Sequence, residues 1–128
     1  EQEVSVQDWY LAGHSLGGVM AASFAADQSD EVAGLIFLAA YPSGDLTDAP
    51  FPVLSIYGSE DEVLNRESYG AAQVKLPDDY TEIVLEGGNH GQFGDYGTQS
   101  GDGTATIATV QQQQQTVEAI TTFIEKNR

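Results

Sequence analysis

The sequence predicts an α/β fold, a parallel sheet with flanking helices. Strand-like apolar segments alternate with helix-like segments along the chain, an order that favours parallel strands joined by crossovers. Residues 34–40 form a near-continuous apolar run, which is typical of a strand buried on both faces of a parallel sheet. At 128 residues the chain has the length of one domain, so we treat residues 1–128 as a single unit.

Four strands and three helices are expected. The strands are predicted at residues 9–12, 34–40, 53–57 and 81–86, and the helices at residues 16–27, 65–75 and 108–126. Small residues in the first helix allow a close approach to the sheet. Segment 43–52 is a polar linker that is too short for a substantial lid domain.

The last helix carries Val110, Val117, Ile120 and Ile124 near one helical face, and we expect this face to pack on the core. The glutamine run 111–115 lies inside the same pattern. We interpret it as the solvated face of a helix rather than as a low-complexity tract.

The composition excludes several kinds of partner. Four Lys and Arg against twenty Asp and Glu give a net charge of -16, which repels phosphate backbones and anionic membranes, so no nucleic-acid partner is expected. No apolar run reaches the length of a membrane span. The absence of cysteine removes disulfides and thiol chemistry and leaves the compartment open. Because the chain begins at Glu1 and not at Met, we interpret it as a fragment and leave open an upstream signal or anchor.

The chain is organised around residues 13–17, Gly-His-Ser-Leu-Gly, which fit the G-x-S-x-G pattern of a nucleophile elbow. A serine hydroxyl is a poor nucleophile unless it is presented to a base and to donors for the developing oxyanion. A strand-to-helix turn projects Ser15 above the sheet edge and aims the backbone N–H of Leu16 at that charge. Side chains at Gly13 and Gly17 are expected to collide with the packed strand and helix. The alternative is an ordinary turn with Ser15 as a helix N-cap.

Two further strand ends supply an acid and a base. Serine acyl transfer needs a base for the hydroxyl proton and an acid to orient that base. His90 follows the last strand and is the predicted base, the alternative being a loop histidine that caps the glycine-rich turn. His14 adjoins Ser15 but faces the wrong way round the turn, and is predicted to pack or to line the pocket. Ligands bind beyond the carboxyl ends of parallel strands, where Ser15, His90 and the acidic loop 60–62 are expected to meet.

Glu60, Asp61 and Glu62 compete for the role of the acid. Asp61 is three residues past Gly58, the offset expected after the strand that precedes the acid turn, and is the predicted acid. One or two of the three are interpreted as solvated loop carboxylates.

The sequence resembles the α/β-hydrolase superfamily, and within it the compact bacterial members related to dienelactone hydrolases. The resemblance rests on the elbow, the acid turn and the glycine-rich loop, at residues 13–18, 57–61 and 87–97. The chain order of nucleophile, acid and base is also that of the superfamily. The resemblance implies Ser15 as nucleophile, Asp61 as acid, His90 as base and the Leu16 N–H as one oxyanion donor.

The resemblance extends over nearly all of the chain but over only the C-terminal half of such a hydrolase. The strands that normally precede the elbow are missing, and with them the loop that supplies the second oxyanion donor. Strand 9–12 is then an exposed apolar edge. We therefore expect it to pair with the missing N-terminal half of the fold or with a second copy of the chain.

Other sites are weaker. The loop 95–103 invites a calcium interpretation, but it fails the EF-hand spacing and lacks the closing Glu, so we interpret it as a structured loop beside His90. Without cysteine and with two histidines a zinc site is not expected, and no phosphate loop or dinucleotide fingerprint is present. No metal and no cofactor is therefore predicted. Tyr41 and Phe93 are expected to line the pocket together with His14.

The predicted function is that of a serine hydrolase, which cleaves a small-molecule ester or related acyl compound through an acyl-enzyme intermediate. The short connection 43–52 predicts an open site and favours small or extended substrates. The alternative is a hydrolase-like module that binds a partner or ligand without turnover, or an inactive fragment.

Overall fold

The computed structural model describes residues 8–94, 97 and 99–127, and in this part of the chain four parallel strands form one sheet. The strands, in their order across the sheet, are β1 (Tyr10–His14), β2 (Gly34–Leu38), β3 (Val53–Gly58) and β4 (Tyr80–Leu85). The helices are α1 (Leu16–Asp27), α2 (Arg66–Ala71) and α3 (Thr109–Lys126), with 3-10 turns at Ser29–Glu31, Ala72–Lys75 and Gly91–Phe93. The predicted α/β fold with a parallel sheet and flanking helices is confirmed.

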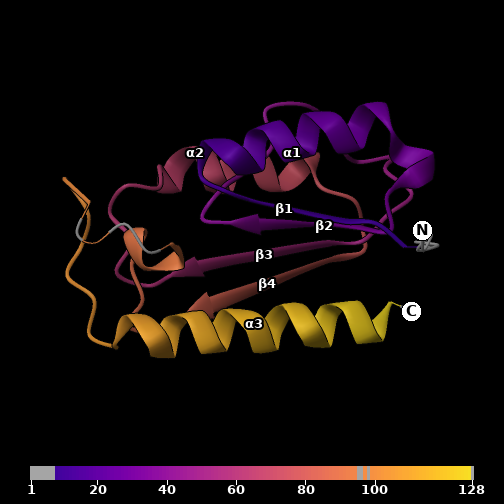
Figure 1. The fold of residues 1–128 in the computed structure, drawn as a ribbon. Coiled ribbons are helices and arrows are strands. Elements are labelled where there is room, and N and C mark those ends of the chain that lie inside the picture. Colours follow the sequence, from indigo (N-terminus) through magenta and orange to yellow (C-terminus); the bar gives the residue numbers. More distant parts are fainter. Residues whose placement is uncertain (1–7, 95–96, 98, 128) are drawn as a thin grey trace, which may run out of the picture.

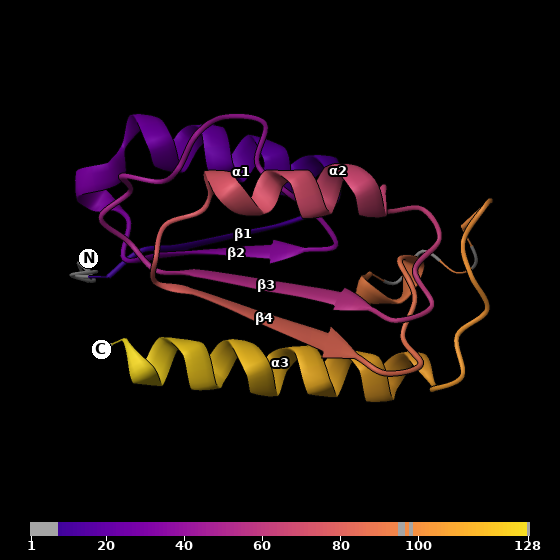
Figure 2. The ribbon, with the colours of Figure 1, turned by 180° about the vertical axis from the view of Figure 1, so that it is seen from behind.

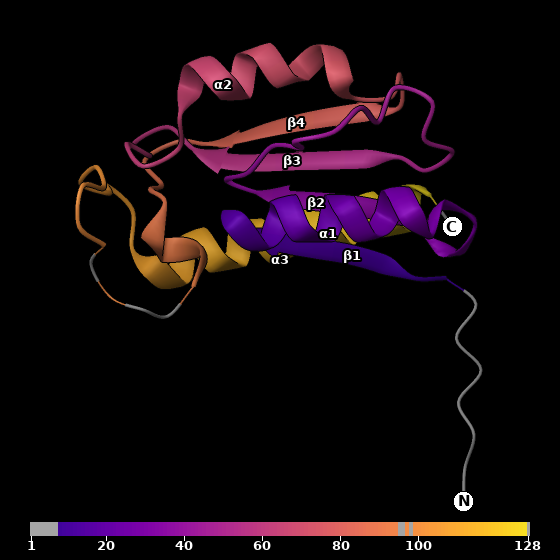
Figure 3. The same ribbon diagram turned by 90° about the horizontal axis from the view of Figure 1, so that it is seen from above.

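The helices cover both faces of the sheet. Figure 1 shows α1 and α2 above the sheet and α3 below it, and Figure 2 shows the same layers from behind. Viewed from above in Figure 3, α1 lies over β1 and β2, whereas α2 lies toward β4. All four strands point the same way, so their carboxyl ends meet at one end of the molecule, where the loop between β4 and α3 also lies.

The core is divided between the two faces because alternate strand residues point to opposite sides of a sheet. The core residues packed with α1 include Ala22, Ala25, Leu35, Phe37 and Val53. Those packed with α3 include Ile36, Leu54, Ile56 and Phe123. Each fully buried large side chain contributes about 1.5–3 kcal/mol. The central strands therefore hold the two layers together.

The buried face of α3 differs from the predicted one. Val110 and Val117 are 63% and 62% exposed, so the prediction that they pack on the core is wrong. Gln112 is fully buried instead, and it lies about 200° from Val110 around the helix axis. The prediction that the glutamine run is solvated is therefore wrong for Gln112. A buried amide is tolerated when its polar atoms are hydrogen-bonded, and those of Gln112 are bonded to Asn89 and Gln92.

The helix predicted at 65–75 is shorter in the structure. Asn65 caps α2 by accepting a hydrogen bond from the Ser68 N–H at 2.9 Å, and the chain continues as a 3-10 turn after Ala71. Tyr69 ties α2 to the sheet, since its hydroxyl lies 2.7 Å from Ser55 Oγ and 2.6 Å from Glu82 Oε2. Burial and the Glu82 carboxylate raise the pKa of Tyr69, so its hydroxyl stays protonated as a donor.

Strand β1 lies at the edge of the sheet and pairs with β2 alone among the described strands. Beside it are apolar side chains with more than half of their surface exposed: Trp9, Leu16, Met20 and Phe24. A hollow of about 270 Å³ in the same region is lined by Trp9, Leu11, Phe24, Glu31 and Val32. We call this surface the β1 edge. None of the helices in the described part of the chain has the length and apolar content needed to cross a membrane.

Candidate active site

The turn between β1 and α1 holds Ser15 in a strained conformation. Its φ of 57° and ψ of -123° lie in a region that costs a non-glycine residue about 1–3 kcal/mol. Two backbone hydrogen bonds fix the turn, from the Ser15 N–H to the Leu38 carbonyl at 3.0 Å and from the Gly18 N–H to the Ser15 carbonyl at 2.9 Å. Such strain is retained where the surrounding structure over-determines it, as at active sites.

The glycines around Ser15 do not all serve the same purpose. A Cβ at Gly13 would overlap the carbonyl oxygen of Gly17, and one at Gly18 would lie 2.5 Å from the Cβ of Ala40. A Cβ at Gly17 would meet no atom within 4 Å among the described residues. The prediction that a side chain would collide with the packed backbone therefore holds at Gly13. It is wrong at Gly17 among the described residues.

Asp61 and His90 form a buried pair at the carboxyl ends of β3 and β4. His90 Nδ1 lies 2.8 Å from Asp61 Oδ2, and the two residues are 1% and 3% exposed. The other oxygen, Asp61 Oδ1, accepts hydrogen bonds from the N–H groups of Val63 and Leu64, both at 2.8 Å. Burial alone would raise the pKa of Asp61, but the hydrogen bonds from His90 and from these N–H groups outweigh it and lower the pKa. Asp61 is therefore a carboxylate at neutral pH.

The neighbouring acids are placed differently. Glu60 Oε2 accepts a hydrogen bond from Ser59 Oγ at 3.3 Å, and Glu62 is exposed. Of the three acidic residues considered from the sequence, Asp61 is thus the one in contact with the His90 ring.

Ser15 and His90 line a common cavity of about 260 Å³. Its other lining residues are Leu16, Val19, Ala39, Ala40, Tyr41, Val63, Leu64 and Asn65. Among the described residues no hydrogen bond joins the Ser15 hydroxyl to the His90 ring. Catalytic hydrogen bonds of this kind are often long before a substrate binds. The structure therefore brings the predicted nucleophile and base to one cavity, with the predicted acid behind the base.

Of the three residues predicted to line the pocket, Tyr41 lines this cavity, whereas His14 and Phe93 are not among its described lining residues. The Nε2–H of His14 donates to the His90 carbonyl at 2.9 Å, and the two imidazole centroids are 4.6 Å apart. The Phe93 ring lies 5.6 Å from that of His14. Burial and the nearby His90 lower the pKa of His14, which favours its neutral form at neutral pH. His14 thus acts as a donor to the backbone of His90.

The sequence profile of the alpha/beta hydrolase family matches residues 1–115, most of the chain. The chain belongs to the alpha/beta hydrolase family. No curated protein matches it in sequence.

Solved structures of hydrolases share this fold. The chain is similar to an esterase from Rhodococcus, with a TM-score of 0.68 and 15% identity, over 93% of this chain and 66% of that one. It is similar to the monoacylglycerol lipase of Paleococcus ferrophilus, with a TM-score of 0.56 and 15% identity over 71% and 63% of the two chains. An alpha-beta serine hydrolase homologue from Coxiella burnetii is 32% identical over 63% and 40% of the two chains, with a TM-score of 0.51. The chain thus spans between 40% and 66% of the length of these three hydrolases.

Several residues that support the candidate site were not predicted from the sequence. Arg66 Nη2 donates to the carbonyl oxygens of Gly58, Ser59 and Asp61 at 3.2, 3.1 and 2.9 Å, and its guanidinium lies 4.8 Å from the centroid of the Tyr57 ring. The Arg66 guanidinium thereby holds the backbone of the acid turn in place. One sequence signal could have identified Arg66. The chain has four Lys and Arg residues, and Arg66 is one of them and lies five residues after Asp61.

Gln112 holds the loop that carries His90 in a similar way. Its Nε2 donates to the Asn89 carbonyl at 2.8 Å, while its Oε1 accepts from the Asn89 N–H at 3.1 Å and from Gln92 Nε2 at 2.8 Å. A Cβ at Gly88 would lie 2.8 Å from this Oε1, so the absence of a side chain there lets the loop approach α3. No local sequence signal distinguishes Gln112 from the four glutamines beside it.

Ala39 follows β2 with a φ of 54°, and it lines the same cavity as Ser15. Its N–H donates to the Ile56 carbonyl at 2.8 Å, which holds the residue in place. No sequence signal predicts this conformation, because glycine is the residue usually found at positive φ.

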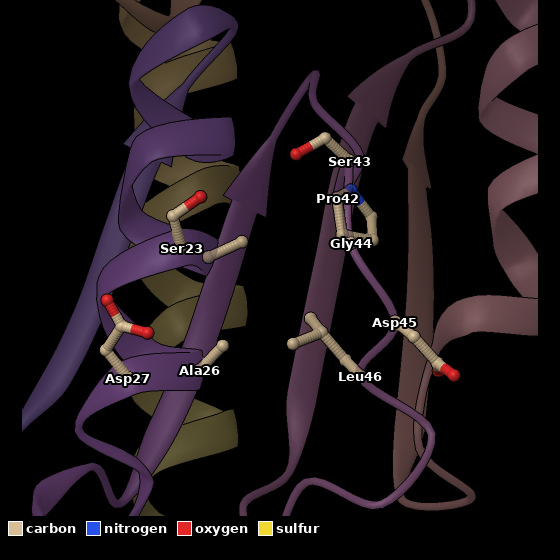
Figure 4. Close-up of a pocket in the computed structure, with 9 residues that line it drawn as sticks. Ser23, Ala26, Asp27, Pro42, Ser43, Gly44, Asp45 and Leu46 are labelled. Atoms are coloured by element: carbon tan, nitrogen blue, oxygen red, sulfur yellow. The ribbon is translucent and has the colours of Figure 1, made fainter.

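A larger hollow lies away from Ser15 and His90. Figure 4 shows it between α1 and the segment after β2, with Leu46 pointing toward the helix and Asp45 pointing away. Its volume is about 350 Å³, and Ser23, Ala26 and Asp27 form its helical side. It contains no histidine and no strained residue, so we assign the site to the smaller cavity. The described residues also contain no group of three or more His, Cys, Asp or Glu side chains that could hold a metal ion.

We predict that Gly13→Ala lowers the free energy of unfolding by about 1–3 kcal/mol, because the new methyl group overlaps the backbone of Gly17. Gly17→Ala is the matched control and should raise stability by up to about 1 kcal/mol, since alanine favours the helix. Urea unfolding of both variants measures the difference. Equal stability of Gly13→Ala and the wild type would contradict this account of the elbow.

We predict that Asp61 stabilises the folded protein at neutral pH and that this stabilisation is lost in acid. Its pKa is lowered below the ordinary 3.8 in the folded protein, so its contribution is present above that value and is lost as the pH falls through the folded pKa. The stability gap between wild type and Asp61→Asn should be wide at pH 7 and narrow below about pH 4. Urea unfolding at pH 7 and pH 3 measures it, with the exposed Asp78→Asn as control. A gap that widens in acid would refute the assignment.

Proposed function

We propose that this chain carries the nucleophile, acid and base of a serine hydrolase that cleaves carboxylic esters or related acyl compounds. One observation carries the proposal: Ser15 has a strained backbone conformation at the elbow and lines one cavity with His90. The Nδ1 of His90 is in turn hydrogen-bonded to Asp61. Family membership and the fold shared with an esterase and a lipase support hydrolysis as the reaction class.

The first half of the reaction forms an acyl-enzyme. His90 Nε2 takes the Ser15 hydroxyl proton as Oγ attacks the ester carbonyl carbon and a tetrahedral oxyanion forms. The intermediate collapses, the bond to the alcohol oxygen breaks, and the imidazolium returns its proton to that oxygen. Asp61 accepts the Nδ1–H of His90 throughout, which keeps Nε2 free as the base and balances the transient positive charge.

The second half releases the acid. A water molecule attacks the acyl carbon while His90 Nε2 takes one of its protons, and the proton is then returned to Ser15 Oγ as the ester bond to serine breaks. The products are a carboxylic acid and the original serine. The same side chains therefore serve both halves of the cycle.

The backbone N–H of Leu16 is proposed as one oxyanion donor. It belongs to the first turn of α1, whose N–H groups have no carbonyl partner within the helix and whose dipole favours negative charge. Removing one oxyanion donor typically costs about 10²–10³ in turnover. We propose that the second oxyanion donor comes from outside the described part of this chain.

Substrates are proposed to be small esters with an apolar acyl group. The cavity of about 260 Å³ has Val19, Tyr41, Val63 and Leu64 in its wall, and these apolar surfaces suit a hydrocarbon group better than a charged one. The net charge of -16 disfavours anionic substrates further.

The partner proposed for the β1 edge is the remaining part of the same hydrolase fold. Among the described strands β1 pairs with β2 alone, and Trp9, Met20 and Phe24 leave an apolar surface beside it. An unpaired apolar edge strand is prone to association. The chain spans only part of each solved hydrolase it resembles, which supports a further segment of that fold as the natural cover.

We predict that Ser15→Ala and His90→Ala each abolish hydrolysis of p-nitrophenyl acetate by the full-length protein, and that the double variant is little worse than either. Residues that act as one unit give strongly non-additive losses. Ser23→Ala is the matched control, because Ser23 is exposed on α1, and it should keep wild-type turnover. Additive losses, or unchanged turnover of Ser15→Ala, would contradict the proposed roles.

We predict that the 128-residue chain alone self-associates through the β1 edge. Sedimentation equilibrium should give a mass above that of the monomer, and Phe24→Lys should lower it because a charge is placed in the apolar surface. Val117→Lys tests an equally exposed apolar side chain on α3 and should leave the mass unchanged. A stable, fully active monomer of the isolated chain would contradict the proposed partner.

A further inference from the structure

Asp102 lies in the loop between the 3-10 turn Gly91–Phe93 and α3, and its carboxylate is saturated with backbone donors. Oδ2 accepts from the Gly91 N–H at 2.8 Å, and Oδ1 accepts from the N–H groups of His90 at 3.2 Å and Gly103 at 2.8 Å. The Glu62 N–H approaches the same Oδ1 at 3.4 Å. The donors come from three separate segments of the chain, so one side chain joins them.

The segments joined by Asp102 are those that present the acid and the base. His90 is itself a donor to Asp102, and Glu62 is the residue next to Asp61. We propose that Asp102 is a positioning residue, which holds the backbones of the acid turn and the base loop at the separation where Asp61 meets the His90 ring. This inference rests on the proposed function of Asp61 and His90 in hydrolysis.

The loop that carries Asp102 is docked on both sides. A Cβ at Gly103 would overlap the carbonyl oxygen of Glu60, so the backbone passes directly against the acid turn. On the other side, Asn89 Nδ2 donates to the Gly103 carbonyl at 3.0 Å, next to the base. Asp102 is therefore held between the two loops that it connects.

A carboxylate suits this position better than an amide. Both of its oxygens accept hydrogen bonds, and bonds to an ionised acceptor are stronger than those between neutral groups. An asparagine has one oxygen, so in either orientation its NH₂ group would face a backbone N–H.

Asp102 does not contact the His90 ring in the structure, and its bonds go to the backbone. Its loss should therefore disturb the orientation of the base more than the binding of substrate. The kcat should fall while KM changes little, because displacements of about 1 Å at a reacting group can cost about 10²-fold in rate.

The test compares Asp102→Asn with Asp45→Asn in the full-length protein. Asp45 is a matched carboxylate that also accepts loop hydrogen bonds, from the Thr47 N–H and hydroxyl at 2.9 and 2.7 Å, in the exposed segment after β2. The readouts are kcat and KM for p-nitrophenyl acetate and the low-field proton NMR resonance of the His90 Nδ1–H. Asp102→Asn should lower kcat by about 10–10²-fold and broaden or abolish this resonance, whereas Asp45→Asn should preserve both.

The outcomes separate this inference from the proposed function. If the wild type hydrolyses the ester and Asp102→Asn equals it in kcat and resonance, Asp102 is not a positioning residue, although the function stands. If the wild type is inactive, the proposed function fails, and an unchanged resonance in Asp102→Asn still overturns the positioning role. If Asp102→Asn does not fold, Asp102→Glu is measured instead, because it keeps the negative charge but displaces the carboxylate oxygens. Wild-type kcat and resonance in Asp102→Glu would then overturn the inference.

Discussion

Asp61 and His90 are buried 2.8 Å apart at the carboxyl edge of the sheet, and most of the surrounding polar structure serves this contact. Burying two ionisable groups is costly unless their remaining hydrogen-bonding capacity is satisfied. The N–H groups of Val63 and Leu64 satisfy the second oxygen of Asp61. Arg66 then fixes the acid turn, and Gln112 fixes the loop that carries His90. The helices α2 and α3 thus contribute to the site as well as to the core.

The topology of the sheet explains why distant residues meet. Parallel strands place the residues after β1, β3 and β4 at one end of the molecule, which is where Ser15, Asp61 and His90 follow their strands. The same topology leaves β1 at an edge, with apolar side chains beside it. The candidate site therefore lies close to the β1 edge, and the proposed nucleophile Ser15 directly follows the strand at that edge.

The strands and the positions of the three candidate catalytic residues were predictable because they depend on local patterns. Apolar runs identify β2 and β3, and a parallel order fixes which strand ends meet. The supporting residues were not predictable, because their roles depend on contacts between distant segments. The sequence predicts Gln112 as a solvated residue, but it packs against Gly88. Ala39 adopts a positive φ, which is not expected for alanine. Asp102 belongs to a loop that the sequence predicts as a structured loop beside His90, but no local pattern shows that its carboxylate links two other loops.

The central claim is that Ser15 is an activated nucleophile. Its most direct test is to treat the full-length protein with a fluorophosphonate, which phosphonylates activated serines, and to locate the adduct by intact mass and peptide mapping. The account predicts one adduct per chain, on Ser15, and none on the exposed Ser23 or Ser43. An unmodified protein, or an adduct on another serine, would contradict it.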